Sequence, residues 1–309
     1  MSRLASLGLV SLLAGCADDP PGSTPPDIDD DTPSFALRPP WRSSSLPADT
    51  HVSTAGHGGD GYFPCPGSHG GGCGYDLGAS RWDPAARAYS GDKTNGGSSQ
   101  ADHAIWGMDL HAPVDGEVVA CWRNMPDDLP DREDDTPPGC AALASGECMA
   151  TGNHLWIRSA DGHLILLAHL MQNSIPERLC PIAEDLPIPD SNADAPCAIA
   201  GKQSGPTDAS RLERLEPAIA YPRITQGEFV GRVGESGQAG GPHLHLSVGT
   251  YEMDADDHYC RSNVLIRWID AEYQVRSDGR APDAGTWTPL DAEPLPIDLK
   301  TFFLIQPDN

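Results

Sequence analysis

Residues 234–248 read Gly-Glu-Ser-Gly-Gln-Ala-Gly-Gly-Pro-His-Leu-His-Leu-Ser-Val, a glycine-rich turn that runs into an alternating stretch. Alternation of polar and apolar residues predicts a β-strand, in which residues two apart lie on the same face. His243 and His245 are therefore expected on one face, while the apolar residues between and after them face a core. Two imidazoles fixed on one face suit a metal ligand beside an acid–base group. A half-exposed strand that happens to carry two histidines satisfies the same pattern.

The composition of the whole chain limits the fold and the partners. Its 309 residues are enough for one or two domains with a buried core. With 33 Gly, 30 Pro and 6% aromatic residues, the chain favours turns and long loops around a β-rich core over a helical bundle. The formal net charge of −25 argues against nucleic acid as a partner, because phosphate backbones are bound by Lys and Arg.

The N-terminus is typical of a secretory signal. Residues 1–16 contain one basic residue, a short apolar run and small residues, and they end in cysteine. The apolar run is too short to span a bilayer. Leu13-Ala14-Gly15-Cys16 resembles the lipobox of bacterial lipoproteins, which implies cleavage before Cys16 and lipidation of its thiol; plain secretion with an incidental Cys16 is the alternative. We therefore expect an exported protein, lipid-anchored in the bacterial cell envelope and facing the periplasm or the cell surface.

The cysteine count indicates disulfide bonds. Eight of the nine cysteines remain after Cys16, and an even number behind an export signal predicts disulfides in an oxidising compartment. A cysteine zinc site is the rival interpretation, but the chain has no Cys-x-x-Cys spacing. Connectivity stays open, since pairing by proximity is only the simplest choice. That choice gives Cys65–Cys73, Cys140–Cys148, Cys180–Cys197 and, with the two left over, Cys121–Cys260.

The chain divides into five segments by composition. After the signal peptide of residues 1–16, residues 17–45 are acidic and Pro-rich and predict a disordered tether. Residues 46–100 form a Gly-rich extension whose histidines we expect in exposed loops, and no function is assigned to it. Residues 101–250 have the regular motifs of a domain, and residues 251–309 form a C-terminal extension.

Several motifs inside residues 101–250 occur in one order and resemble the lysostaphin-type zinc endopeptidases, which cut peptide cross-links in bacterial cell walls. They are Asp-x-x-Ala-Pro-Val-x-Gly from Asp109, Gly-Asn-His, Ala-His-Leu, and the Gly-x-Ser-Gly…Pro-His-Leu-His signature that ends at His245. The resemblance implies a mainly β fold, with an antiparallel β-sheet core, a groove for one zinc ion and long disulfide-bearing loops. Insertions at about 123–151 and 172–222 interrupt the domain. The apolar runs on either side of Asp161-Gly162 also predict a β-hairpin.

The resemblance implies roles for four residues. His245 and Asp109 would bind zinc, while His243 and His169 would act on the activated water. The alternatives are ordinary structural roles: Asp109 stabilising a turn, and His169 hydrogen-bonded at a sheet edge.

The first metal-ligand motif departs from the family. The family has a histidine four residues before the aspartate, and this chain has Ile105 there, which cannot bind zinc. A catalytic zinc takes three protein ligands and an open water position, so another histidine must serve. His103 and His111 both share a face with Asp109 in a regular strand. Resemblance to sequences with an upstream histidine favours His103.

Two functions remain in competition. The first is a zinc-dependent endopeptidase that hydrolyses peptide cross-links of peptidoglycan, with Zn2+ as cofactor and the wall peptide as partner. The second is a catalytically degenerate lipoprotein of the same fold that binds wall peptides or activates another cell-wall hydrolase. Ile105 favours the second function, whereas retention of all four active-site residues favours the first. A generic disulfide-rich surface lipoprotein does not explain the ordered motifs, and the oligomeric state is left open.

Overall fold

The computed structural model describes residues 34–54, 74–93, 99–127, 151–180, 222–237, 239–253, 259–276, 279–282, 285–290 and 303–307. The predicted signal peptide with Cys16, and the predicted pairs Cys65–Cys73 and Cys140–Cys148, lie outside these residues. Within the described ranges, no helix has the length and apolar character needed to cross a membrane.

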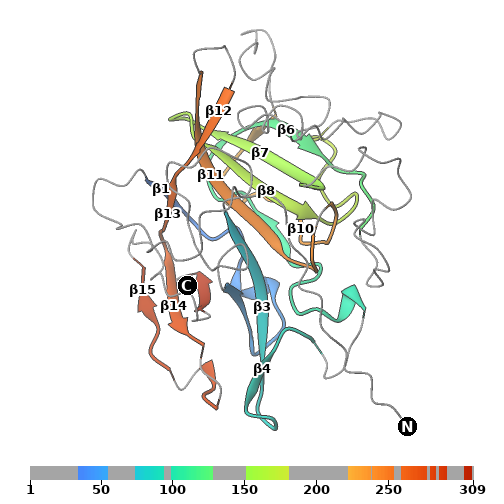
Figure 1. Cartoon of the computed structure of the whole chain (residues 1–309), viewed down its shortest axis with the longest axis vertical. Helices are drawn as coiled ribbons and strands as arrows, with labels where there is room; N and C mark the ends of the chain where they lie inside the picture. Colours follow the sequence, from blue (N-terminus) through green and yellow to red (C-terminus); the bar gives the residue numbers. More distant parts are fainter. Residues whose placement is uncertain are drawn as a thin grey trace, which may run out of the picture.

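The fold is mainly β and its strand pairs are almost all antiparallel, which confirms the predicted fold class (Figure 1). A twelve-stranded sheet dominates it, with β4 (Ala88–Ser90) and β12 (Tyr259–Asn263) paired to β3 and β11 off the main path. In sheet order, the strands of that path are β15 (Thr288–Pro289), β14 (Ala271–Val275), β16 (Phe303–Pro307), β2 (Thr50–Thr54), β3 (Tyr75–Asp83), β11 (Leu244–Met253), β8 (Leu164–Leu170), β7 (Asn153–Ser159), β6 (Gly116–Trp122) and β9 (Arg223–Ile224).

Two small sheets accompany the large one. β5 (Asp109–His111) pairs antiparallel with β10 (Phe229–Arg232). β1 (Ser34–Leu37), which lies within the predicted tether of residues 17–45, pairs parallel with β13 (Leu265–Trp268). The helices of the described chain are two short 3-10 turns, η1 (Ser43–Ser45) and η2 (Gln100–Asp102).

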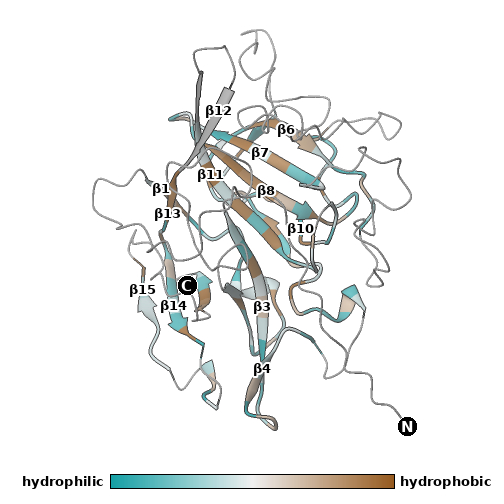
Figure 2. Cartoon of the chain, viewed as in Figure 1, coloured by the Kyte–Doolittle hydropathy of each residue, from teal (hydrophilic) through white to brown (hydrophobic). Residues whose placement is uncertain are grey.

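The middle of the large sheet is buried on both faces. All seven residues of β8 are buried, so the strand reads as a continuous apolar run and not as an alternation. Its alternate residues belong to two core clusters, one with Ile165 and Leu167 and the other with Leu164 and Leu166. Figure 2 shows hydrophobic residues along β7, β8 and β11. The predicted hairpin at Asp161-Gly162 joins β7 to β8, and Gly162 has the positive φ of 92° that such turns require.

One disulfide lies within the described residues, and it corrects the predicted connectivity. Cys121 on β6 is bonded to Cys180, with 5.7 Å between their Cα atoms. The predicted pairs Cys121–Cys260 and Cys180–Cys197 are therefore wrong. The physical reason is that the fold brings β6 beside the buried Leu179 and Cys180, although 59 residues separate the two cysteines in sequence. The prediction of disulfides as such is confirmed.

The segment 46–100 contributes central strands to the sheet. β2 and β3 both fall in this segment, and β3 pairs with the start of β11. The register places Leu77 opposite Leu244 and Asp76 opposite His245. A segment to which the sequence assigned no function therefore runs beside the His-Leu-His motif.

Candidate active site

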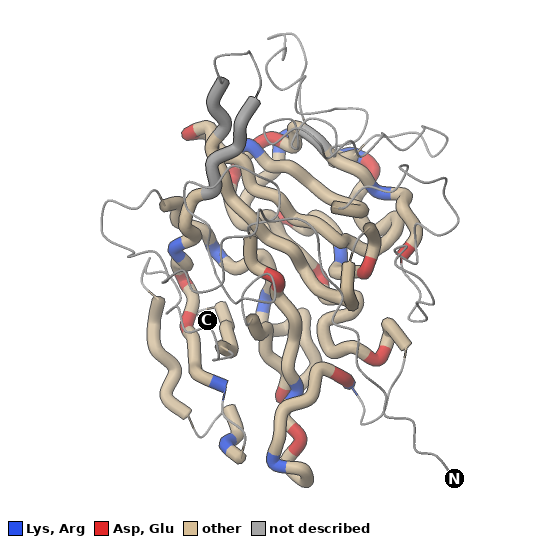
Figure 3. The backbone as a smooth tube through the Cα atoms, viewed as in Figure 1, with Lys and Arg blue, Asp and Glu red and all other residues tan. Residues whose placement is uncertain are grey.

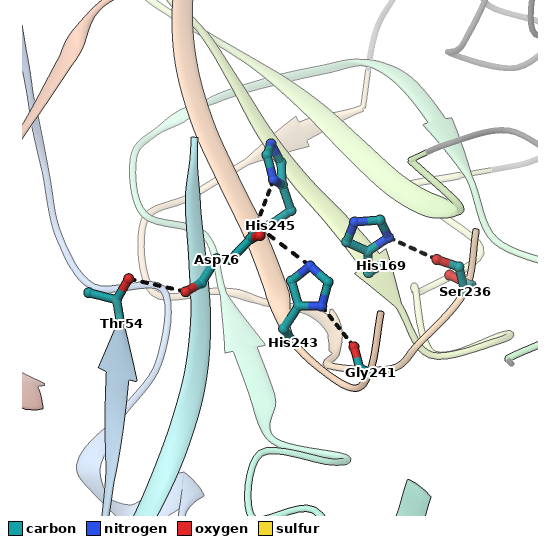
Figure 4. A network of polar contacts seen from close by, with 7 residues as sticks. All are labelled: Thr54, Asp76, His169, Ser236, Gly241, His243 and His245. Atoms are coloured by element: carbon teal, nitrogen blue, oxygen red, sulfur yellow. Dashed lines mark hydrogen bonds and ion pairs between the residues drawn. The ribbon is translucent and has the colours of Figure 1, made fainter. Parts of the chain in front are cut away.

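The two histidines of the His-Leu-His motif meet a carboxylate from β3 (Figure 4). His245 Nδ1 lies 2.9 Å from Asp76 Oδ1, and His243 Nε2 lies 3.5 Å from the same oxygen. The β3–β11 register produces the first contact directly, because it sets Asp76 opposite His245. The alternation of the motif, which keeps His243 and His245 on one face, produces the second.

The hydrogen bond between His243 and the Gly241 carbonyl oxygen determines the tautomer of the His243 ring. His243 Nδ1 lies 2.7 Å from the Gly241 carbonyl oxygen, and a carbonyl can only accept, so Nδ1 carries the proton. In the neutral ring, Nε2 then presents a lone pair to the Asp76 carboxylate. Two acceptors facing each other are stable only when a proton or another cation lies between them. A proton or another cation held between His243 Nε2 and Asp76 is therefore stabilised by the carboxylate.

His245 is held in a tight cradle. It is 5% exposed, and the backbone of Gly74 lies beneath its ring. A Cβ atom at position 74 would lie 2.8 Å from His245 Nε2 and 2.6 Å from the Leu246 carbonyl oxygen, closer than real Cβ atoms approach. Glycine is required at this position because the ring and the adjacent strand occupy the space of a side chain.

His169 completes a cluster of three histidines. Its ring centroid lies 4.6 Å from that of His243 and 6.1 Å from that of His245. Its Nδ1 donates to the Ser236 carbonyl oxygen at 2.8 Å, so Nε2 is free to accept a proton. Burial lowers the pKa of His169 well below 6.5, and the neighbouring His243 and His245 lower it further. His169 is therefore neutral at neutral pH, in the form that a general base requires.

The other predicted site residues have different partners. The Asp109 side chain is about half exposed, and its Oδ1 accepts from Arg232 Nε at 2.9 Å. His103 is also about half exposed, and its Nδ1 lies 3.9 Å from Asp92. His111, the second candidate, packs edge-to-face on Phe229 with centroids 6.3 Å apart.

The sequence interpretation did not include Asp76. The signal that was available is the alternation around Asp76 in Tyr-Asp-Leu-Gly-Ala, which is typical of a strand with its polar side facing outward. Alternation alone does not indicate the partner strand. The pairing of β3 with β11 joins residues about 170 positions apart, and only the fold reveals it.

The donor set matches zinc in part. Zinc in proteins is bound by His nitrogen, Cys sulfur and carboxylate oxygen, and two ligands of one tetrahedral zinc lie roughly 3.3 Å apart. His245 Nδ1 and Asp76 Oδ1, 2.9 Å apart, have the required chemistry and nearly this spacing. In the described part of the chain, no group of three or more His, Cys, Asp or Glu residues is arranged to hold a metal ion. A catalytic zinc takes three protein ligands, and the described residues provide two of them, His245 and Asp76.

Charged residues of both signs are distributed along the described part of the chain. Figure 3 shows Lys and Arg interspersed with Asp and Glu over the described chain.

Comparison with known proteins finds solved structures that are similar to this chain. No protein-family model and no curated protein sequence matches the chain. The catalytic domain of the antimicrobial peptidase lysostaphin from Staphylococcus simulans is similar at 13% identity over 55% of this chain and 84% of that chain, with a TM-score of 0.22. A mutant catalytic domain of the prophage-encoded protein EnpA from Enterococcus faecalis is similar at 16% identity over 54% of this chain and 81% of that chain, with a TM-score of 0.18. At these identities and TM-scores, the similarity assigns no activity to this chain.

Proposed function

We propose that the protein is a zinc-dependent endopeptidase that hydrolyses peptide cross-links of bacterial peptidoglycan. The observation that carries the proposal is the convergence of His169, His243 and His245 beside Asp76. One imidazole of this cluster is neutral with a free Nε2, and another lies against a carboxylate. Amide hydrolysis by an activated water molecule requires groups that accept and donate protons and a carboxylate that can bind a metal ion. The histidines and Asp76 are residues of these types.

We assign Asp76 and His245 as two of the zinc ligands. Asp76 is favoured over Asp109 because its carboxylate already contacts the histidines, whereas the Asp109 carboxylate is neutralised by Arg232. Asp109 and His103 remain predictions from the sequence, and the experiment below compares them with Asp76. When bound, zinc supplies a Lewis acid that polarises the scissile carbonyl and lowers the pKa of water.

We assign different roles in the reaction to His169 and His243. His169 accepts the proton of the attacking water at Nε2, since its Nδ1 proton is held by the Ser236 carbonyl. His243, whose Nε2 lies 3.5 Å from Asp76, is assigned to stabilise the oxyanion that develops on the carbonyl. The proton taken by His169 then passes to the leaving amine.

The proposal includes export and a wall partner. The buried Cys121–Cys180 disulfide supports folding in an oxidising compartment. An anchor at lipidated Cys16, with the tether behind it, would let the domain reach peptidoglycan peptides.

A non-catalytic wall-binding protein is the second candidate. Two observations favour it: Ile105 is buried in the core where the family has a histidine, and the described residues supply two metal donors and not three. Such a protein would bind wall peptides or activate another hydrolase without holding zinc. Metal content separates the two candidates.

The test begins with metal content and wall digestion by the chain from residue 17 onward. One equivalent of zinc and release of new amine termini from purified peptidoglycan support the enzyme. Variants at the proposed and alternative ligands identify the donors, and His163→Ala, a histidine in the β7–β8 turn, is the matched control. A folded, disulfide-bonded protein without zinc would overturn the enzyme and leave the binding protein. The variants are Asp76→Ala, His245→Ala, Asp109→Ala, His103→Ala and His111→Ala.

A further inference from the structure

A buried hydrogen-bond network next to His169 plays no part in the chemistry derived above. Its two central side chains, Ser236 and Asn153, are completely buried. Ser236 Oγ donates to the Leu170 carbonyl oxygen at 2.8 Å and accepts from the Asn153 backbone N–H at 2.8 Å. Both bonds of the hydroxyl therefore go to the backbone of the strands that carry and flank His169.

The Asn153 side chain extends the network to a third segment. Its Oδ1 accepts from the Met125 N–H at 2.7 Å, and its Nδ2 donates to the carbonyl oxygens of Met125 and Leu170 at 2.7 and 3.0 Å. These partners fix the orientation of the amide, because an N–H can only donate and a carbonyl can only accept. Asn153 thus connects β7 with the segment of Met125 and with Leu170, the residue that follows His169 on β8.

The backbone of His169 needs such support. Its φ is +62°, a left-handed conformation that residues with a Cβ atom rarely adopt. The β7–β8 register shifts between Asn153 and Leu155, so His169 lies in a β-bulge, a feature that redirects a side chain beside active sites. The His169 N–H donates to Thr151 at 3.0 Å, and its carbonyl accepts from Gly234 at 2.9 Å.

Asp127 holds the adjoining loops together. Its Oδ1 accepts from the Glu235 N–H at 3.0 Å, and its Oδ2 accepts from the Gln172 N–H at 2.9 Å. Gly234 makes this approach possible, since a Cβ atom there would lie 2.4 Å from Asp127 Oδ1. The loop that carries Ser236 is therefore fixed on both sides of the network.

We propose that Ser236 and Asn153 are positioning residues that set the tautomer of His169. By fixing the Ser236 peptide, they keep its carbonyl oxygen against His169 Nδ1, which retains the proton there and leaves Nε2 as the acceptor. The partner of one ring nitrogen sets the protonation of the other, so a displaced carbonyl releases the Nδ1 proton. The catalytic consequence rests on the proposed peptidase function, whereas the tautomer itself does not.

The test measures tautomer and turnover in the same variants. Long-range proton–nitrogen correlation spectra of protein labelled with 15N-histidine report which ring nitrogen carries the proton, and the His169→Gln spectrum identifies the signals. We expect the Nδ1–H form in the wild type and a mixture with the Nε2–H form in Ser236→Ala and Asn153→Ala. On wall peptides, kcat should fall about 10- to 100-fold with KM changed less than about twofold.

Matched variants separate positioning from general destabilisation. Ser159→Ala removes another buried hydroxyl, one that donates to the His163 carbonyl oxygen in the β7–β8 turn, and should change neither tautomer nor kcat. Ser236→Cys keeps the size of the side chain if the alanine variant fails to fold. Folded variants at Ser236 that keep the Nδ1–H form and wild-type kcat would overturn the proposal. If the wild type hydrolyses no wall peptide, the proposed function fails, and the spectra still decide the role of Ser236 and Asn153.

Discussion

Two aspartates on strands of different sheets show how differently the same side chain can be placed. Asp76 on β3 contacts His243 and His245, and its side chain is 27% exposed. Asp109 on β5 is 45% exposed and pairs with Arg232. The first carboxylate contacts imidazole rings, whereas the second is paired with a guanidinium group. The sequence motifs predict Asp109 as a zinc ligand, whereas the contacts with the histidines favour Asp76.

The difference follows from the strands that carry them. β3 lies next to β11 in the large sheet, so its side chains meet the His-Leu-His motif. β5 belongs to a small sheet with β10, and its register sets Asp109 opposite Arg232. A carboxylate becomes a candidate ligand through its strand partner as much as through its local motif.

Substitution of Asp76 should have the largest effect on zinc content and wall digestion. The same substitution at Asp109 should have a much smaller effect. We expect Asp76→Ala to lose zinc and to reduce wall digestion by more than about 100-fold, the upper range for residues that merely support a metal site. Asp109→Ala should keep zinc and remain within about tenfold of wild-type activity. Zinc analysis and digestion kinetics measure both. The reverse result would restore Asp109 as the ligand and remove Asp76 from the site.

The cradle under His245 gives the next largest effect. Gly74→Ala introduces a Cβ atom against His245 Nε2, the Leu246 carbonyl oxygen and the Ser247 Cβ. Overpacking of this kind costs about 1–3 kcal/mol of unfolding free energy, and displacement of His245 should also weaken zinc binding. Urea unfolding and zinc titration measure the two losses.

A matched glycine substitution tests the cause. Gly91→Ala adds the same methyl group where nothing lies within 4 Å, so it should leave both stability and zinc binding nearly unchanged. Equal effects from the two substitutions would show that the close approach beneath His245 is not what makes Gly74 necessary.

The sequence predicted the parts of the fold that depend on local pattern. The alternation after His243 is found as β11, and Asp161-Gly162 forms the expected hairpin. The histidine cluster was also within reach of sequence reasoning, since His169 was proposed beside His243 and the two rings lie 4.6 Å apart. Each of these features depends on alternation, a turn dipeptide or an ordered motif.

The features that the sequence did not predict depend on long-range pairing. Asp76 reaches His245 across a strand pair that no local pattern specifies, and Cys180 reaches Cys121 over 59 residues of chain. Loop closure costs free energy that grows only slowly with loop length, so proximity in sequence is a weak guide to contacts in a large sheet. Burial of β3 and β6 against the core determines these pairings.

The buried cluster should also make stability depend on pH, by a smaller amount. Burial and the neighbouring histidines lower the pKa of His169 in the folded protein, so protonation favours the unfolded chain, where the pKa is near 6.5. The stability from neutral His169 is complete above pH 6.5 and is lost as pH falls below that value. In chelator-treated protein, a change from pH 7.5 to 5.5 should destabilise the wild type by about 1 kcal/mol more than His169→Gln.

The same pair of proteins controls for other histidines. Burial also lowers the pKa values of His51 and His111, and both residues are present in the wild type and the variant. Their contribution cancels in the difference between the two urea-unfolding curves. Parallel pH profiles for the wild type and His169→Gln would contradict a buried, neutral His169.

The smallest effect is expected at the second aspartate of the comparison. Arg232→Ala removes the partner of Asp109, but both side chains are about half exposed, so water screens their attraction. Exposed ion pairs contribute about 0–1 kcal/mol, and we expect a change in that range with zinc content and wall digestion unchanged. A gain of a second zinc equivalent in Arg232→Ala would instead show that Arg232 keeps a cation away from Asp109. In that case, the two aspartates would differ in their present partners and not in their capacity to bind metal.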